Sequence, residues 1–142
     1  MALSDVERDY LDGQPLGRLA TVDVDGIPQN NPVGFSYNET TGTIAVGGRA
    51  MGSTRKFANV AATGVAALVV DDIVSRDPWT VRGIEIRGRA EALSGQPTDS
   101  PHASGEIIRI HPTRIITWGL DSAHPAMTGR TVDGKSQRPG LA

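Results

Sequence analysis

Apolar residues along this chain mostly fall in short runs that alternate with polar residues, a period typical of β-strands with one buried face. The longest run covers residues 80–93, where Val81 and Ile86 are interleaved with charged side chains. Asp25 and Gly26 are a strong hairpin signal between two other runs. Altogether the pattern predicts six or seven strands, the others lying at 16–22, 28–37, 43–47, 65–70, 107–110 and 114–118.

Two stretches depart from the alternation and predict short helices. Ser4 and Glu7 have the spacing of a capping box, so a first helix should begin there and end near Leu11. A second helix should begin after Ser53 and end near Gly64. Short hairpin-linked strands with few aromatic residues favour a small antiparallel barrel. We therefore expect an all-β dominated fold, a β-barrel with short helices, in which a ligand would lie on the rim or between subunits.

Three local features refine this expectation. Pro32, within the run 28–37, argues for an edge strand, a bulge or a bend. Residues 71–78 are polar and are expected to form a loop. His111 and Pro112 are expected to divide the last two strands.

The length of 142 residues is natural for one domain. We expect that domain to occupy residues 1–120, because residues 121–142 carry almost no apolar pattern. The latter form a C-terminal tail, which is either disordered or packed on a partner subunit.

Composition narrows the classes of function. The formal net charge is −2 and no basic stripe occurs, so no nucleic-acid partner is expected. The absence of cysteine excludes disulfides, thiolate catalysis and cysteine-based zinc sites. The N-terminus lacks a signal-peptide pattern and no apolar run could span a bilayer, so we expect a cytoplasmic protein with no membrane partner.

The most informative chemistry lies at residues 53–56. Ser53, Thr54, Arg55 and Lys56 follow an apolar strand and a glycine-rich turn and open the second helix. A helix start offers unpaired N–H groups and partial positive charge, and two cations beside it make a plausible phosphate seat. The alternative is a Ser53 N-cap followed by two solvated cations, and the segment alone favours that alternative.

Other polar residues have structural explanations beside any functional one. The three histidines share no metal-like spacing, so no metal site is expected, and no catalytic triad occurs, so no catalytic residue is assigned. Asp71 and Asp72 are adjacent, and adjacent residues of a strand point to opposite faces, which favours a solvated strand end over a carboxylate pair. Trp79 either plugs the barrel end or a dimer interface, or forms a pocket wall.

The order of these segments resembles the pyridoxamine 5'-phosphate oxidase-like, flavin-binding split-barrel superfamily. Within it, the chain is most similar to small actinobacterial oxidoreductases that depend on the deazaflavin coenzyme F420. No single stretch is decisive, but the ordered series is specific and makes the phosphate seat the favoured interpretation. The matching stretches are 16–22, 25–29, 32–35, 42–48, 54–60, 65–72, 77–79, 82–91 and 110–119.

The resemblance implies a six-stranded antiparallel split β-barrel, the FMN-binding split-barrel fold. It also implies a homodimer with two cofactor sites in the grooves between subunits. The resemblance implies three groups of cofactor-binding residues. The cofactor phosphate would be bound by Ser53, Thr54, Arg55, Lys56 and Asn59. The tricyclic ring would lie beside Asn31, Pro32, Val33, Gly47 and Gly48, and Trp79 and Arg82 would reach toward the cofactor or substrate.

Departures from the family pattern bear on the cofactor. Flavin-using oxidases of this family carry an arginine where Asn31 stands and a lysine where Ser36 stands, and their C-terminal substrate segment is missing here. These losses argue against vitamin B6 phosphate oxidation. The leading hypothesis is an F420-dependent oxidoreductase that transfers a hydride to or from a small electron-poor substrate. The alternatives are an FMN-dependent oxidoreductase using the same site, and a non-catalytic protein that binds F420, a flavin or haem.

Overall fold

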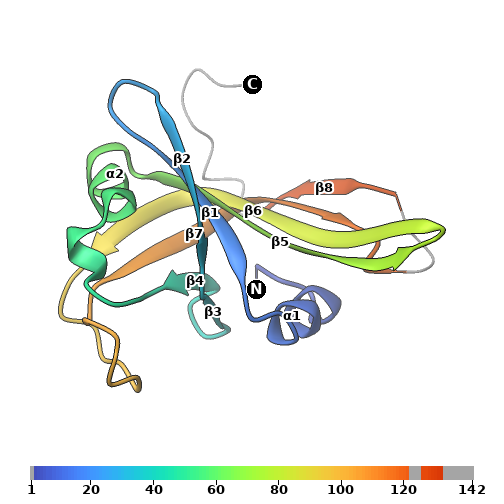
Figure 1. Ribbon diagram of the computed structural model, residues 1–142, viewed down its shortest axis with the longest axis horizontal. Helices are drawn as coiled ribbons and strands as arrows, with labels where there is room; N and C mark the ends of the chain where they lie inside the picture. Colours follow the sequence, from blue (N-terminus) through green and yellow to red (C-terminus); the bar gives the residue numbers. More distant parts are fainter. Residues whose placement is uncertain (1, 122–125, 133–142) are drawn as a thin grey trace.

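The computed structural model describes residues 2–121 and 126–132. Two α-helices and one 3-10 helix accompany eight strands (Figure 1). The helices are α1 (Asp5–Asp12), η1 (Met51–Ser53) and α2 (Arg55–Thr63). The strands are β1 (Gly17–Val22), β2 (Pro28–Val33), β3 (Ser36–Asn38), β4 (Thr43–Val46), β5 (Val65–Arg76), β6 (Trp79–Leu93), β7 (Ile107–Trp118) and β8 (Thr128–Thr131).

All strand pairs are antiparallel and belong to one sheet in the order β2-β1-β5-β6-β7-β4-β3, with β8 paired to β7. The sheet curls without closing, because β2 and β3 lie at its two ends and do not pair with each other. The expected all-β dominated split barrel is therefore confirmed, with eight strands in its sheet where the resemblance implied six. The inner face holds an aliphatic core, whose fully buried side chains include Leu19, Ile44, Val46, Val60, Leu68, Val70, Ile84, Ile86, Ile108, Ile110 and Ile115.

The predicted return strand 28–37 is two strands rather than one. β2 ends at Val33 and β3 begins at Ser36, on opposite ends of the sheet order. Pro32 lies on the edge strand β2, as its missing N–H requires.

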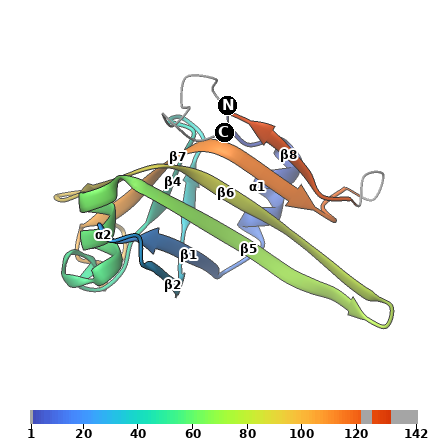
Figure 2. The same cartoon turned by 90° about the horizontal axis from the view of Figure 1, so that it is seen from above.

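The prediction of a polar loop at residues 71–78 is wrong. β5 continues to Arg76 and pairs with the first residues of β6, so the two strands form a long arm that projects from the barrel (Figures 1 and 2). The acidic residues at the base of the arm are compatible with a strand because each has an ionic partner. Arg18 Nη1 donates to Asp71 Oδ1 at 2.6 Å, and Arg82 Nε donates to Asp72 Oδ1 at 2.8 Å.

The predicted division of the last strand is also wrong, because β7 runs without interruption through Pro112. The register between β6 and β7 shifts next to Gly88, which pairs with Pro112. A Cβ on Gly88 would lie 1.9 Å from the carbonyl oxygen of His111. Gly88 therefore makes room for a bulge that lets the proline remain in the ladder.

Part of the predicted tail belongs to the sheet. Residues of β8 pair with β7, and Arg130 of β8 donates from Nη2 to Glu7 Oε1 at 2.6 Å and to the carbonyl of Ala2 at 2.7 Å. Glu7, although charged, is only 5% exposed. β8 thus fastens α1 to the sheet, while the packing of the tail on a partner subunit stays a prediction.

Candidate functional site

The turn between β4 and α2 is built from an unusual backbone. β4 ends at Val46, and Gly47 and Gly48 lead to Ala50, which has φ 46° and ψ 39°. Ala50 has the one positive φ among the described non-glycine residues, and such a left-handed alanine carries a cost of about 1–2 kcal/mol. Surrounding contacts hold Ala50 in this conformation, and the chain then continues into η1 and α2.

Thr54, and not Ser53, is the N-cap of α2. Thr54 Oγ1 accepts a hydrogen bond from the N–H of Phe57 at 3.2 Å and donates to the carbonyl of Met51 at 2.7 Å. Ser53 lies in η1, where its hydroxyl donates to the carbonyl of Ala50 at 3.0 Å. The prediction of a Ser53 cap is therefore wrong by one residue, and both hydroxyls are engaged in shaping the turn.

Arg55 and Lys56 occupy the first two positions of α2. Within residues 2–121 and 126–132, neither side chain makes a hydrogen bond or an ion pair, and neither backbone N–H finds an acceptor. α2 also has no acidic residue in its first turn. Two cations and two free N–H groups at the positive end of a helix fit a phosphate or carboxylate group.

Asn59, predicted to help hold the cofactor, faces the interior of the protein. It is 5% exposed, and its Nδ2 donates to Thr21 Oγ1 at 3.1 Å and to Gln29 Oε1 at 3.3 Å. These bonds join α2 to β1 and β2. In this structure Asn59 positions the helix, and any contact with a ligand would have to use its remaining amide oxygen.

The predicted ring-facing residues lie on β2 and at the end of β4. Asn31 is half-buried, Pro32 is exposed and Val33 belongs to the core. A Cβ on Gly47 would approach nothing closer than 3.7 Å, and one on Gly48 nothing closer than 3.8 Å. The packing of the described chain thus does not require glycine at either position, which leaves close approach of a ligand as a reason for it.

Trp79 and Arg82 lie on the part of β6 that forms the arm, and the arm projects away from α2 (Figure 1). Trp79 is 65% exposed, so it does not plug the barrel of its own chain. The structure therefore does not bring these two residues to Arg55 and Lys56 within the single chain.

Arg82 is already engaged in a cluster with α1. It forms a two-point ion pair with Asp72, its guanidinium lies 5.0 Å from the centre of the Tyr10 ring, and the Tyr10 hydroxyl donates to Asp72 Oδ1 at 2.7 Å. The hydrogen bond from Arg82 lowers the pKa of Asp72. Burial and the neighbouring Asp72 carboxylate raise the pKa of Tyr10. The solvated strand end expected at Asp71 and Asp72 is instead a pair of ion pairs on opposite faces.

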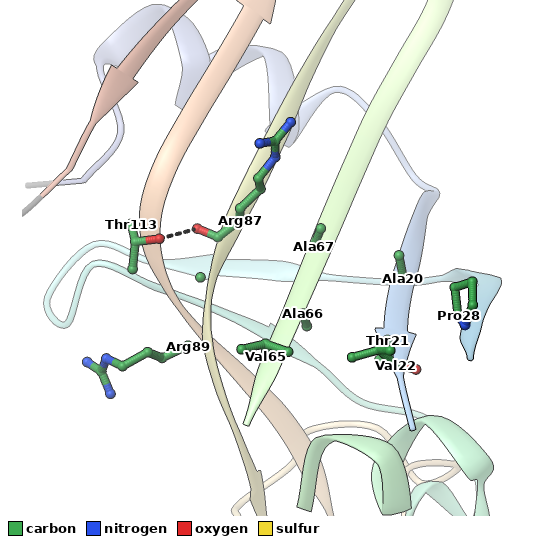
Figure 3. Close-up of a pocket in the computed structure, with 11 residues that line it drawn as sticks. Ala20, Thr21, Val22, Pro28, Val65, Ala66, Ala67, Arg87, Arg89 and Thr113 are labelled. Atoms are coloured by element: carbon green, nitrogen blue, oxygen red, sulfur yellow. Dashed lines mark hydrogen bonds between the residues drawn. The ribbon is translucent and has the colours of Figure 1, made fainter. Parts of the chain in front are cut away.

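A hollow of about 260 Å³ lies on the outer face of the sheet (Figure 3). Ala20 and Val22 of β1 and Val65 and Ala67 of β5 form its apolar wall, and Arg89 points away from them. Its volume is below the range usual for ligand pockets, about 300–1,000 Å³. This hollow does not include the start of α2.

Three residues near the seat carried no signal in the sequence. Ser104 bonds to the turn at Gly48 and Met51, and Arg49 approaches His102, with 3.4 Å between Nη2 and Nδ1. Glu106 packs against Gly52, where a Cβ would lie 1.9 Å from its Oε2. All three contacts join residues more than 50 positions apart, so no local pattern could reveal them.

Two negative findings concern the described residues only. No group of three or more histidine, aspartate or glutamate side chains there could hold a metal ion. None of the helices in the same part of the chain has the length and apolar character needed to cross a bilayer.

The open antiparallel split barrel, with its cationic helix start beside a glycine turn, defines a class. Residues 3–119 match the pyridoxamine 5'-phosphate oxidase family, and the chain belongs to that family. Among its relatives is 5a,11a-dehydrotetracycline/5a,11a-dehydrooxytetracycline reductase from Streptomyces rimosus subsp. rimosus. The two are 49% identical over 122 residues, which cover 85% of this chain and 86% of the relative. This relationship supports an oxidoreductase activity.

Solved structures agree on the fold. A conserved hypothetical protein from Mycobacterium tuberculosis superimposes with a TM-score of 0.66 at 21% identity, covering 89% of this chain and 91% of that one. An FAD-binding protein from Mycobacterium smegmatis superimposes with a TM-score of 0.56 at 22% identity, covering 90% and 94%. At these identities the likeness shows the fold alone.

Proposed function

We propose that this protein is an F420-dependent reductase of an electron-poor, polycyclic substrate. The observation that carries the proposal is the pair Arg55 and Lys56 at the start of α2, whose side chains and N–H groups find no partner among the described residues. The relative from Streptomyces rimosus, named for reducing dehydrotetracyclines, supports the reductase and the class of substrate. The absence of cations at Asn31 and Ser36 favours a deazaflavin over FMN.

The residues at the start of α2 would hold the cofactor by its phosphate. Arg55 can fork onto two phosphate oxygens, Lys56 adds a compact charge, and the two N–H groups point along the helix axis. Thr54 and Ser53 take part indirectly, because their hydroxyls keep the turn in shape. Gly47 and Gly48 leave space for a flat ring at the end of β4.

β2 would lie beside the tricyclic ring of the cofactor, with the unpaired edge of the strand facing the ring. Pro28 and Pro32 are four residues apart, so their nitrogens face the same side of the strand, and prolines in a sheet occupy positions whose nitrogen faces away from the neighbouring strand. By the same alternation the N–H of Asn30 points to the open edge and is available to a ring carbonyl. Asn31 contributes through its half-buried side chain.

Reduced F420 supplies a hydride when bound, and with a proton from solvent the conjugated double bond of the substrate becomes a single bond while the deazaflavin is oxidised. The chain needs no dedicated acid for this reaction. Its residues place the two flat molecules face to face and keep them oriented.

The same proposal includes a homodimer. The outer face of the sheet carries apolar side chains from the hollow to the tip of the arm, among them Trp79, 65% exposed, and Ile73, 44% exposed. The charges between them are mostly paired, Arg18 with Asp71 and Arg87 with Glu85. Paired charges lose hydration on burial but cost less to bury than lone charges, so such a face can be buried against a second copy. The arm of one protomer would then bring Trp79 to the seat of its partner.

Titration with the two cofactors tests the proposal. Oxidised F420 should bind with quenching of its fluorescence, FMN should bind at least tenfold more weakly, and reduced F420 should be consumed when a dehydrotetracycline is added. Tighter binding of FMN would transfer the assignment to a flavin enzyme. Binding of F420 without its consumption by dehydrotetracyclines, quinones or enones would indicate a carrier and contradict a reductase.

A further inference from the structure

Ser104 lies in the loop between β6 and β7, yet its hydrogen bonds to the described residues go to Gly48 and to Met51, the first residue of η1. Its backbone N–H donates to the carbonyl of Gly48 at 3.1 Å, and its hydroxyl donates to the same carbonyl at 3.3 Å. The hydroxyl also accepts from the N–H of Met51 at 3.1 Å. One side chain thus joins both ends of the segment 48–51.

That segment contains the left-handed Ala50. An alanine prefers other conformations, so the turn needs an external constraint to keep this one. The three bonds of Ser104 bracket Ala50 from both sides and supply that constraint. Met51, which receives one of them, is 2% exposed and fixes the turn to the core.

The geometry downstream depends on this segment. The carbonyl of Ala50 accepts from the N–H and the hydroxyl of Ser53, and the carbonyl of Met51 accepts from the N–H and the hydroxyl of Thr54. Thr54 in turn caps α2. A rotation at Ala50 would therefore change where Arg55 and Lys56 stand.

The loop that carries Ser104 is itself braced. The N–H of Gln96 donates to the carbonyl of Gly105 at 2.8 Å, which closes the loop at its base. Arg109 of β7 reaches the Gln96 amide oxygen at 3.5 Å. Glu106 packs against Gly52 of η1, where a side chain would have to displace the Glu106 carboxylate. The loop is thus a firm support for the turn.

We propose that Ser104 is a positioning residue for the anion seat: it holds residues 48–51 in the left-handed turn that aims Arg55, Lys56 and their N–H groups at one phosphate. This role rests on the proposed function of the seat. Ser104 does not touch the cofactor, and it acts through the backbone of Gly48 and Met51.

The test compares Ser104→Ala, Ser104→Thr and Ala50→Gly with the native protein. Ser104→Ala should weaken F420 binding about tenfold, the factor expected for one or two ordinary hydrogen bonds, with kcat at saturating cofactor unchanged. Ser104→Thr keeps the hydroxyl and should restore binding. Ala50→Gly should partly rescue Ser104→Ala, because glycine adopts the left-handed conformation without help. The urea midpoint of each variant shows whether it is folded under the assay conditions, so a loss of affinity in a fully folded Ser104→Ala reports the turn and not global destabilisation.

Inorganic phosphate serves as a second probe that does not depend on the redox cofactor. Its binding should shift the amide resonances of Arg55 and Lys56, with weaker binding in Ser104→Ala, and the Met51 amide should exchange faster in that variant. Unchanged phosphate and F420 affinity in Ser104→Ala, with affinity lost in Arg55→Ala, would overturn the role of Ser104 and leave the proposed function intact. If the protein bound phosphate in a Ser104-dependent way but did not bind F420, the role of Ser104 would stand and the proposed function would be overturned. Absence of both ligands from the seat would overturn both.

Discussion

The two α-helices of this protein begin in opposite ways. α1 starts with a complete capping box between Ser4 and Glu7 and has acidic residues in its first turn, where they complement the helix dipole. α2 has only the Thr54 cap, and its first two residues are cations that oppose the dipole. α1 is therefore satisfied by its own chain, whereas α2 is left with positive charge that an anion from outside would balance. This contrast distinguishes two kinds of charge: the charges at the start of α1 stabilise the fold, and those at the start of α2 are available for binding.

The largest expected effect is on binding at the start of α2. Replacement of Arg55 and Lys56 together by alanine should weaken F420 affinity at least a hundredfold, since charge-assisted contacts contribute about 1.5–3 kcal/mol each. Fluorescence titration measures the affinity. The urea midpoint should stay the same or rise, because two cations leave the positive end of the helix.

The matched control for that variant is Arg8→Ala, which removes a cation from α1. Arg8 pairs with Asp5 and Glu39, so the substitution should leave F420 affinity unchanged. Equal losses of affinity in both proteins would mean that overall charge, rather than the seat, governs binding.

A smaller effect is expected on stability at α1. Arg130→Met leaves the Glu7 carboxylate buried without its partner and should lower the free energy of unfolding by about 2 kcal/mol, less than for a fully buried pair because the Arg130 side chain is 43% exposed. Urea unfolding measures the change. Arg114→Met, on the neighbouring strand β7, removes an exposed arginine that bonds to Thr131 and should cost under about 0.5 kcal/mol.

The same pair predicts a pH dependence. Burial raises the pKa of Glu7, but the hydrogen bonds from Arg130 and from the Ser4 N–H, together with the charge of Arg130, outweigh it and lower that pKa below the ordinary 4.5. A lowered pKa in the folded state stabilises the protein above pH 4.5, and this contribution is lost as the pH falls through the folded pKa. Unfolding curves between pH 6 and pH 3 should therefore be less pH-dependent in Glu7→Gln. If the free energy of unfolding of Glu7→Gln changed with pH as steeply as that of the native protein, the lowered pKa of Glu7 would be contradicted.

The smallest expected effect on stability is at Gly47. A methyl group there meets nothing within 3.7 Å and the φ of Gly47 is not positive, so Gly47→Ala should change stability by no more than about 0.5 kcal/mol. F420 affinity should nevertheless fall, because the methyl group would occupy the space proposed for the ring. Unaltered affinity would move the ring away from the end of β4.

Local signals predicted much of the fold and long-range contacts decided the rest. The capping box of Ser4 and Glu7 and the turn at Asp25-Gly26 lie where the sequence predicts them, since both depend on neighbours within four residues. The length of β5 was underestimated because the partners that neutralise Asp71 and Asp72 lie elsewhere in the sequence.

The candidate site shows the same division. Arg55 and Lys56 could be singled out because a helix start beside a glycine turn is a local pattern. Ser104 could not, because its bonds to Gly48 and Met51 depend on how a distant loop folds back. The inward orientation of Asn59 also follows from distant residues on β1 and β2.

The separation of Trp79 from Arg55 along the length of one protomer has a genetic consequence, if the groove is shared as proposed. A chain with an inactivating substitution in the arm and a chain with one at the start of α2 would each be inactive alone. A heterodimer of the two would nevertheless contain one intact groove. Co-expression of the two defective alleles should then recover part of the wild-type turnover, and dilution that separates the copies should abolish it.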